Sequence, residues 1–477
     1  MGQNDMGLFT VIIVAAWSCL CAISESRAEQ VSSWPEIELT TADRILIFAP
    51  HPDDEVLDCA GIIQKAVARK IPCRVVFFTL GDSNEWSFVL YRKHLVVMPK
   101  AVRAMGEVRH NEAIAADSSL GLTPQNLIFL GYPDFRTLSI WNTHWGKSPA
   151  ARGLFTDVRA VPYANAFRPG APYKGEEILK DIKAVLLDFK PTKVFISHPA
   201  DHNPDHRALY LFTHIALWDL SGEITPQLYP YLIHYARWPQ PAGYHPKEQI
   251  SPPPLFKDLL WQANELTPEQ VERKYQAIQK HHSQFIARPQ LLLSFIRTNE
   301  LFSDLSVIRL IPQEFGTAST EMEKQNALED MTQEALTDEE RASFIGIEKR
   351  FVQREGDELV FTIELSRPLD EATEFSLYVF GYRNDQPFAS MPKLHIMLGA
   401  LEHKVYDQFR RLPNKSIRVR RHAKEITVRI PLALLDNPQR VLSSANTYLL
   451  MGPALDWTIW QIFELEGAAQ GGSAPGL

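Results

Sequence analysis

Four polar side chains that could do chemistry follow a short apolar run near the start of the chain. Residues 45–55 read ILIFAPHPDDE, so His51, Asp53, Asp54 and Glu55 come directly after a stretch that is typical of a buried strand. In open parallel sheets, ligands bind outside the carboxyl ends of the strands. His51 and Asp54 lie three residues apart in a turn, where an imidazole nitrogen and a carboxylate oxygen could bind one cation. The segment therefore indicates a site at the edge of a sheet.

A second polar cluster follows another strand-like run, residues 192–197. Residues 197–206 read SHPADHNPDH and include His198, His202 and His206, and His206 is expected at the start of the next helix. Each cluster alone has a simpler explanation, because acids before a helix usually cap it and a His-rich loop usually lies on the surface. Two clusters at equivalent strand ends favour a shared site. A catalytic zinc typically takes three such ligands and a water.

The elements that must position these residues alternate between strand-like and helix-like patterns. The alternation predicts βαβ units and an α/β fold, with a Rossmann-like, mainly parallel sheet that carries helices on both faces. The expected strands are residues 44–49, 73–80, 126–130, 192–197 and 231–236, and the expected helices are residues 56–70, 103–120, 176–189, 206–218 and 267–282.

A long segment, residues 133–175, interrupts this rhythm. It is rich in Trp, Tyr, Arg, Pro and Gly. Structureless loops of that length are usually functional lids or disordered, and the aromatic content favours a packed lid. These aromatic side chains suit stacking on sugar faces, although filling a core explains them nearly as well.

The length of 477 residues exceeds what one hydrophobic core usually supports, so we expect more than one folded unit. After a first domain at residues 43–312, residues 313–344 read as an acidic helical connector. Residues 345–466 show period-two patterns that predict a β-sandwich. The late Trp457 and Trp460 make glycan binding one interpretation of this sandwich, and a structural or protein-docking role is another. Residues 467–477 read as a flexible tail.

The start of the chain predicts export. Residues 8–23 are apolar, and Ala28 ends a small-x-small pattern that a signal peptidase could cut, so residues 1–28 read as a signal peptide. We expect a periplasmic or extracellular protein with no stable membrane span after cleavage. An N-terminal membrane anchor is the alternative, because no Lys or Arg precedes the apolar segment. The remaining cysteines, Cys59 and Cys73, are expected to be free thiols.

The formal net charge of −8 offers no basic face for a nucleic acid, so we expect no nucleic-acid partner.

The ordered motifs resemble those of the PIG-L/LmbE superfamily of zinc-dependent N-acetylglucosaminyl deacetylases. The resemblance covers residues 43–312 and leaves out the C-terminal third. Its motifs are APHPDDE at residues 49–55, Arg109-x-x-Glu112, FLGYPD at residues 129–134, DxNxDHRA at residues 201–208 and KxxAIxxHxSQ at residues 274–284.

This resemblance implies that His51, Asp54 and His206 bind one zinc ion per chain and that Asp53 is the general base. Zinc can lower the pKa of a bound water from about 15.7 to roughly 7, so a neighbouring carboxylate can take its proton near neutrality. The implied reaction is removal of the acetyl group from an N-acetylglucosamine-type sugar of an exported or cell-surface glycan. The expected partner is therefore an acetylated amino-sugar, and no cofactor beyond the metal is expected.

This chain departs from the family's motifs at the residue that would donate a proton to the leaving amine. Many members carry a histidine where this chain has Asn203, and an amide cannot protonate the leaving amine at neutral pH. We therefore expect His198 or His202 to take that role beside Asn203, with a proton returned by Asp53 as a further route.

The resemblance also implies residues that bind the substrate, namely Arg109, Asp134 and Asp201. For Arg109, an i,i+3 pair with Glu112 on a helix is the competing interpretation. Outside these sets, His281 and His282 read as packing or surface residues rather than as ligands.

Two other functions remain open. A zinc amidase or deacylase could act on a glycoside, a glycolipid or a thiol conjugate. A catalytically inactive domain could instead bind glycans.

Overall fold

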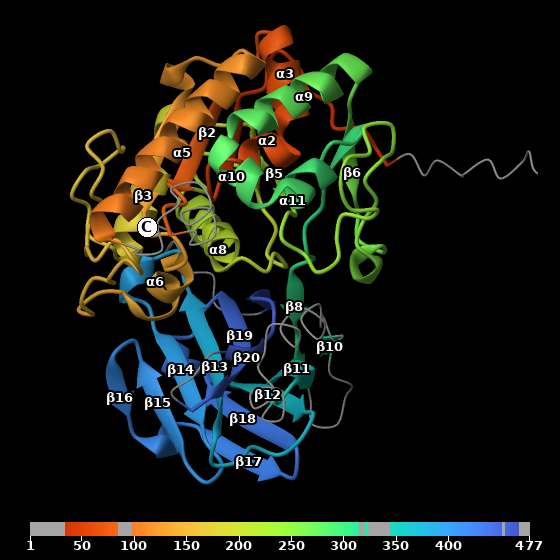
Figure 1. Ribbon diagram of the computed structural model, residues 1–477. Helices are drawn as coiled ribbons and strands as arrows, with labels where there is room; N and C mark the ends of the chain where they lie inside the picture. The colour runs from red at the N-terminus through yellow and green to blue at the C-terminus, as the bar shows by residue number, and fades with distance from the viewer. Residues whose placement is uncertain (1–33, 84–97, 314–319, 323–343, 451–453, 467–477) are drawn as a thin grey trace, which may run out of the picture.

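The computed structural model describes residues 34–83, 98–313, 320–322, 344–450 and 454–466 (Figure 1). The expected signal peptide at residues 1–28 and the tail at residues 467–477 lie outside the described residues. So does most of the expected helical connector at residues 313–344, in which the described residues 320–322 form a strand rather than a helix.

The first domain is built on a seven-stranded sheet with the order β3-β2-β1-β4-β5-β7-β6. The first five strands in this order, β3, β2, β1, β4 and β5, are parallel to one another. β7 and β6 add an antiparallel edge beside β5. All five residues of β1 are buried, as expected for a strand covered on both faces. The strands are β1 (Ile45–Ala49), β2 (Cys73–Thr79), β3 (Leu127–Tyr132), β4 (Lys193–Ser197), β5 (Gln227–Tyr231), β6 (Gln262–Glu265) and β7 (Asn299–Phe302). The predicted mainly parallel α/β sheet is confirmed.

The helices form two groups about this sheet (Figure 1). Right-handed crossovers run outward from β1 in opposite directions, towards β3 and towards β5, so the connecting helices cover opposite faces. The first group is α2 (Asp54–Asp58), α3 (Ala60–Ala68), α5 (Pro99–Leu120) and α9 (Pro268–Lys280), followed by α10 (His282–Ala287) and α11 (Pro289–Ser294). The second group is α6 (Thr137–Thr143), α7 (Gly175–Phe189) and α8 (Pro204–Asp219).

Two predicted elements differ from the structure. The expected helix 56–70 starts earlier and is broken at Cys59 into α2 and α3. The fifth strand was expected at residues 231–236. The structure has it at Gln227–Tyr231, so it ends where it was predicted to begin. β5 pairs with β4 residue by residue, and this pairing stops at Tyr231 because β4 ends opposite it at Ser197. The buried residues that follow cross the edge of the sheet rather than extend it.

The C-terminal domain is a sandwich of a six-stranded and an eight-stranded sheet, as predicted, but its sheets also include strands at residues 308–310, 312–313 and 320–322, before the expected start at residue 345. Apolar side chains from both sheets form its core, including Phe361, Leu377 and Val428. The six-stranded sheet holds β9 (Pro312–Gln313), β10 (Thr320–Met322), β11 (Ile347–Glu355), β12 (Glu358–Leu365), β17 (Arg418–His422) and β18 (Glu425–Pro431). The other holds β8 (Ile308–Leu310), β13 (Thr373–Tyr382), β14 (Lys393–Leu398), β15 (His403–Asp407), β16 (Arg410–Leu412), β19 (Arg440–Leu449), β20 (Ala454–Trp457) and β21 (Gln461–Leu465).

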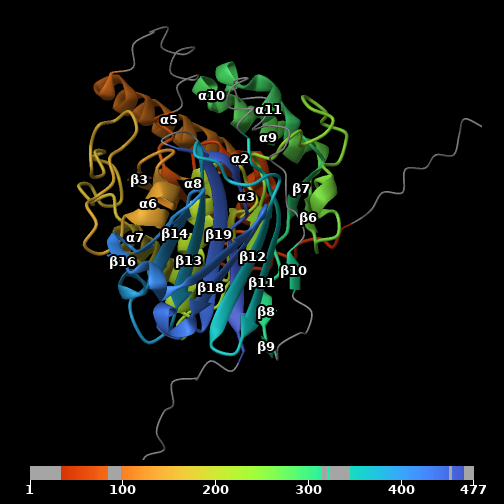
Figure 2. The same ribbon diagram turned by 90° about the horizontal axis from the view of Figure 1, so that it is seen from below.

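A shared aromatic core joins the two domains where α6 and α8 meet the sandwich (Figures 1 and 2). Trp141 of α6 is fully buried, and its ring lies 5.5 Å from that of Phe388 and 5.7 Å from that of Trp460. Trp145 lies 5.1 Å from Phe388. The segment 133–175 is therefore packed, as predicted, and these two tryptophans of it fill a core rather than face a ligand.

The two tryptophans that suggested glycan binding by the sandwich turn towards the first domain. Trp460 is 3% exposed within the shared aromatic core. The guanidinium of Arg207 lies 3.6 Å from the centroid of the Trp457 ring, and the ring of His202 lies 5.8 Å away. Both tryptophans therefore contribute to the contact between the domains.

A buried lysine in this contact gives a prediction about pH. Lys393 is 1% exposed, its amine donates to the carbonyl oxygens of Phe388 and Met391, and burial lowers its pKa to about 7. The unfolded chain takes up this proton below about pH 10.5, so the lysine favours unfolding increasingly as the pH falls from 10 to 7. We expect Lys393→Met to raise the melting temperature by a few degrees at pH 6. The gain should shrink as the pH approaches 10, in melting curves recorded at both values, and an equal gain at both would contradict the assignment.

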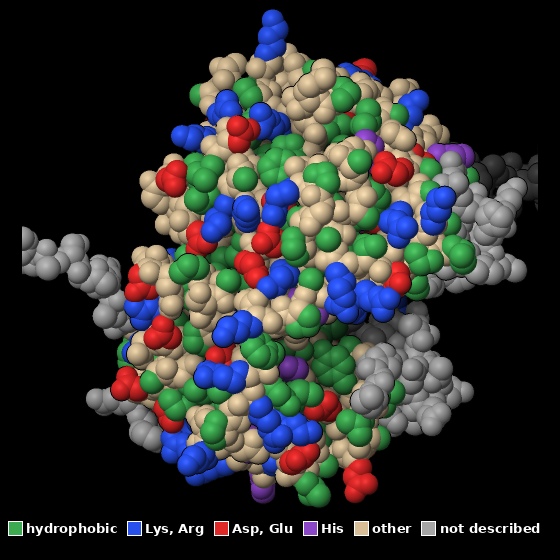
Figure 3. All heavy atoms as spheres, turned by 90° about the vertical axis from the view of Figure 1, so that its left-hand side faces the viewer, with side chains coloured by type: hydrophobic (Ala, Val, Ile, Leu, Met, Phe, Trp, Pro, Cys, Tyr) green, Lys and Arg blue, Asp and Glu red, His purple; other side chains and the backbone are tan. Residues whose placement is uncertain are grey.

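Figure 3 shows acidic and basic side chains interspersed over both domains on the face in view. Among the described residues, no helix is both long and apolar enough to span a membrane.

Candidate metal and active site

The two polar clusters meet at the point where the strand order reverses. His51 and Asp53 lie in the turn between β1 and α2, Asp54 begins α2, and His206 lies in the first turn of α8, the helix that follows β4. β1 and β4 are adjacent and parallel, so both turns open at the same edge of the sheet. Crossovers leave β1 and β4 in opposite directions, which leaves a crevice between them where open α/β sheets bind ligands.

Three donor atoms converge in this crevice. His51 Nδ1 lies 3.1 Å from Asp54 Oδ2, His206 Nε2 lies 3.1 Å from the same oxygen, and the two nitrogens are 3.3 Å apart. Donors bound at about 2.0–2.2 Å to a tetrahedral zinc lie roughly 3.3 Å from one another. The triangle therefore has the dimensions and the donor types of one face of such a site. These are the three residues expected as ligands, and the structure brings them together.

The second nitrogen of each histidine faces a carboxylate. His51 Nε2 lies 3.2 Å from Asp134 Oδ1 and 3.3 Å from Asp205 Oδ2, and His206 Nδ1 lies 3.1 Å from Asp201 Oδ2. Metal-binding histidines are usually oriented in this way, because a carboxylate on the far nitrogen fixes the tautomer and makes the near nitrogen more basic. This arrangement is a further reason why the residues fit a bound cation.

The charge around the triangle is strongly negative. Burial opposes the protonation of both histidines, yet the neighbouring carboxylates raise the pKa of His51 well above its usual value and that of His206 to about 9. Burial likewise disfavours the Asp54 carboxylate, but His206 and His51 hold its pKa below the usual range. A divalent cation would supply the positive charge that these carboxylates favour.

Backbone N–H groups hold the carboxylates of Asp201 and Asp205 in place. Asp201, which was expected to bind substrate, is fully buried and accepts hydrogen bonds from the backbone N–H groups of Ile233, His234 and Asn203. Its carboxylate therefore supports His206 and does not line the pocket. Asp205 plays the corresponding part for His51 and is held by the backbone N–H groups of Phe135 and Thr137.

Asp53 lines the pocket beside His51 and Asp54. Burial raises the pKa of its carboxyl to about 6, although the guanidinium of Arg109 lowers it. Arg109 Nη2 lies 3.1 Å from Asp53 Oδ1, and the guanidinium also donates to the carbonyls of Pro52 and Gly81. Glu112 instead accepts from Ser283, so the alternative pair between Arg109 and Glu112 does not form.

The expected proton donors occupy different environments. His198 is fully buried, packs against Phe256 and Trp261, and does not line the pocket; burial lowers its pKa to about 3. His202 also lies off the pocket, and burial lowers its pKa to about 4. Asn203 does line the pocket, and its Oδ1 caps α8 by accepting from the Asp205 N–H, so its amide Nδ2 is the group that can donate to a ligand.

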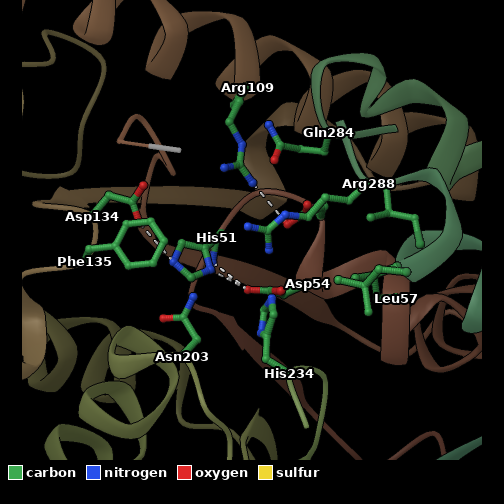
Figure 4. A pocket seen from close by; sticks show the side chains of 13 residues that line it. His51, Asp54, Leu57, Arg109, Asp134, Phe135, Asn203, His234, Gln284 and Arg288 are labelled. Atoms are coloured by element: carbon green, nitrogen blue, oxygen red, sulfur yellow. Dashed lines mark hydrogen bonds and ion pairs between the residues drawn. The ribbon is translucent and has the colours of Figure 1, made fainter. Parts of the chain in front are cut away.

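The pocket includes residues that the sequence analysis did not select. Besides His51, Asp54, Asp53, Arg109, Asn203 and Asp134, its wall is formed by Leu57, Phe135, His234, Gln284, Arg288, Leu291 and Leu292. In Figure 4, His51 lies between Asp134 and Asp54, and Arg288 extends towards the pocket on the Asp54 side. His234 lies just past the end of β5, where the rule applied to β1 and β4 could have found it. For Arg288 the sequence held no comparable signal.

The position of Asp201 predicts an effect on metal affinity. We expect Asp201→Asn to weaken metal binding about 10–100-fold, because the carboxylate that orients His206 is lost. Competition with a chelating dye would measure the dissociation constant. An unchanged constant together with a raised KM would instead return Asp201 to the substrate-binding role expected from the sequence.

Residues 46–217 match a family model described as PIG-L, GlcNAc-PI de-N-acetylase. Two proteins from Mycobacterium sp., strains KMS and JLS, named 1D-myo-inositol 2-acetamido-2-deoxy-alpha-D-glucopyranoside deacetylase, are each 31% identical over 202 residues, or 42% of this chain. The chain spans 59% of the length of these relatives.

A similar solved structure is an N,N'-diacetylchitobiose deacetylase from Pyrococcus horikoshii, at 19% identity and a TM-score of 0.30. The likeness covers 51% of this chain and 71% of the other.

The family match includes both clusters of the crevice, from β1 to α8, and it ends before the motif at residues 274–284 that also supported the resemblance. The PIG-L family match therefore covers the part of the first domain that forms the crevice.

Proposed function

We propose that this chain is a zinc-dependent deacetylase that hydrolyses the acetamide of N-acetylglucosamine-type sugars and releases acetate. The observation that carries the proposal is the Asp53 carboxylate, which lines a pocket beside three converging metal-donor atoms. The family match and the names of the mycobacterial relatives support the choice of an acetylated amino-sugar.

In this proposal, different residues bind the metal, accept the proton and orient the base. A zinc ion held by His51, Asp54 and His206 would acidify a water and polarise the amide carbonyl. Asp53 accepts the proton of the attacking water, and Arg109 keeps the carboxylate turned towards the pocket. General-base assistance of this kind is typically worth about 10²–10⁴-fold in rate.

The leaving amine needs a proton, and the pocket favours Asp53 as its source. His198 and His202 do not line the pocket, and their low pKa values keep them neutral near pH 7. Asp53 gains a proton when the water attacks, and it can return that proton to the amine. When water attacks the carbonyl carbon, the negative charge develops on the carbonyl oxygen, and Asn203 can donate an N–H to this oxyanion, where such a donor is most effective.

The pocket wall suits a sugar amide. Arg109, Gln284 and Asp134 offer polar groups for hydroxyls, whereas Leu57, Leu291 and Leu292 form an apolar side that could receive the methyl of an acetyl group. Such a mixture of apolar wall and a few oriented polar groups is usual for small-molecule sites.

The test is acetate release from chitooligosaccharides and a panel of other acetylated glycans by the purified, zinc-loaded protein. Release that requires zinc would support the proposal. Turnover of thiol-conjugate or lipid-linked amides in place of the glycans would favour the broader amidase reading. Sugar binding without any turnover would favour a glycan-binding protein.

We further propose that the protein is exported, on the basis of the apolar segment at residues 8–23 and Ala28. The intact mass of secreted protein that starts at Glu29 would support export. A mass that retains Met1 would favour a membrane anchor or a cytoplasmic protein.

A further inference from the structure

The backbone of Asp53 has a conformation that residues with a side chain rarely adopt. Its φ is 131° and its ψ is −29°. Such a conformation costs on the order of 1–3 kcal/mol and persists only where the surroundings enforce it, most often at active sites. The structure must therefore contain groups that hold this peptide unit in place.

One group on the carboxylate side is Arg109. Its Nη2 donates to the carbonyl of Pro52 at 2.6 Å and to Asp53 Oδ1 at 3.1 Å, while its Nη1 donates to the carbonyl of Gly81 at 2.8 Å. A side chain at position 81 would overlap this guanidinium, because a Cβ there would lie 2.0 Å from Nη1. Arg109 thus fixes the carbonyl before Asp53 and one oxygen of its carboxylate.

The N–H of Asp53 is held by a different pair of residues. Glu55 Oε2 accepts this N–H at 2.9 Å, and Glu55 Oε1 lies 3.0 Å from His281 Nε2. Both side chains are fully buried. His281 comes from the junction of α9 and α10, far along the chain from the turn that it supports.

We propose that Glu55 and His281 are positioning residues that hold Asp53 in its catalytic conformation. His281 donates its Nε2–H to one oxygen of Glu55, which orients the other oxygen towards the Asp53 N–H. The strained peptide unit is then fixed from both sides, by Arg109 and by Glu55, and the carboxylate stays directed into the pocket. The catalytic part of this inference rests on the proposed deacetylase function, and its conformational part does not.

A helix-start carboxylate is the simpler role for Glu55, which lies in the first turn of α2. That role needs no partner on the side chain. The buried His281, which comes from the junction of α9 and α10, fixes the orientation of the Glu55 carboxylate. Stabilisation of the helix dipole does not require a fixed orientation.

The test compares His281→Leu with His281→Gln in the full, zinc-loaded chain. Leucine removes the donor, whereas the glutamine amide can place an N–H close to the position of Nε2. We expect kcat to fall about 10–100-fold in His281→Leu, as a displaced catalytic group of this kind costs. KM and the zinc dissociation constant should stay within about threefold, and His281→Gln should recover most of kcat.

A matched control is His214→Leu, which replaces another buried histidine, packed against Tyr210 and Trp218 and outside the pocket. It should lower the melting temperature and leave kcat unchanged. An unchanged kcat in His281→Leu would overturn the proposal. A raised KM together with weaker zinc binding would also overturn it.

A crystal structure of His281→Leu tests the same proposal without any turnover. We expect the φ of Asp53 to leave the positive region once Glu55 is released. A retained φ near 131° would overturn the positioning role. If the wild-type protein hydrolyses none of the amides, the proposed function fails, and this structure still decides whether His281 holds Asp53.

Discussion

Replacing Asp53 with asparagine is expected to reduce kcat about 10²–10⁴-fold, because the amide cannot accept the proton of the attacking water. The zinc content should stay at one ion per chain, since the three donor atoms of the triangle belong to His51, Asp54 and His206. Acetate release and metal analysis on the same preparation would measure both quantities.

The same substitution at Asp58 provides the control. Asp58 is also buried and ends α2, the helix that Asp53 precedes, but it does not line the pocket, and burial raises the pKa of its carboxyl well above the usual value. Asp58→Asn should therefore change neither turnover nor zinc content. Turnover by Asp53→Asn within a few-fold of the wild type would contradict the role of Asp53 as base.

Removing the metal is expected to have the other large effect. Treatment with a chelator should abolish acetate release, because the polarised carbonyl and the acidified water both depend on the cation. It should also lower the melting temperature, since a ligand that binds only the folded chain stabilises it by mass action. Adding back zinc, manganese or cobalt in turn would identify the metal that restores most activity.

His206→Ala should reproduce the metal-free state without a chelator. It removes one of the three donors and leaves the Asp201 carboxylate buried without the imidazole that faces it. His214→Ala, two turns further along α8, is the control and should bind metal normally. A metal-free protein with full activity, or His206→Ala with a full zinc content, would contradict the proposed site.

Much of the fold could be predicted from the sequence because its signals are local. The buried run at residues 45–49 and the histidine and carboxylates after it defined both a strand and the position of a site at its end. The same reasoning for β4 placed His206 at the opposite side of the crevice. In the sandwich, period-two patterns anticipated β12, β13 and β18 because each strand has one face on the core.

The contacts between distant segments could not be predicted in this way. Asp205 and Asp201 look alike in the sequence, yet they support different histidines, His51 and His206. His281 read as a packing or surface residue, and only the fold shows that it is paired with Glu55. Such pairings depend on how α8, α9 and α10 pack against the turns of the sheet, for which a single sequence carries no local signal.

The family match leaves out part of the shared aromatic core. The match ends at residue 217, but Trp141 and Trp145 within it are covered by Phe388 and Trp460 of the sandwich. A shortened chain that kept only the matched residues would present these indole rings to water and would be prone to aggregate. The matched residues therefore leave out part of the core that buries these rings, and we expect stable protein only from a chain that keeps both domains.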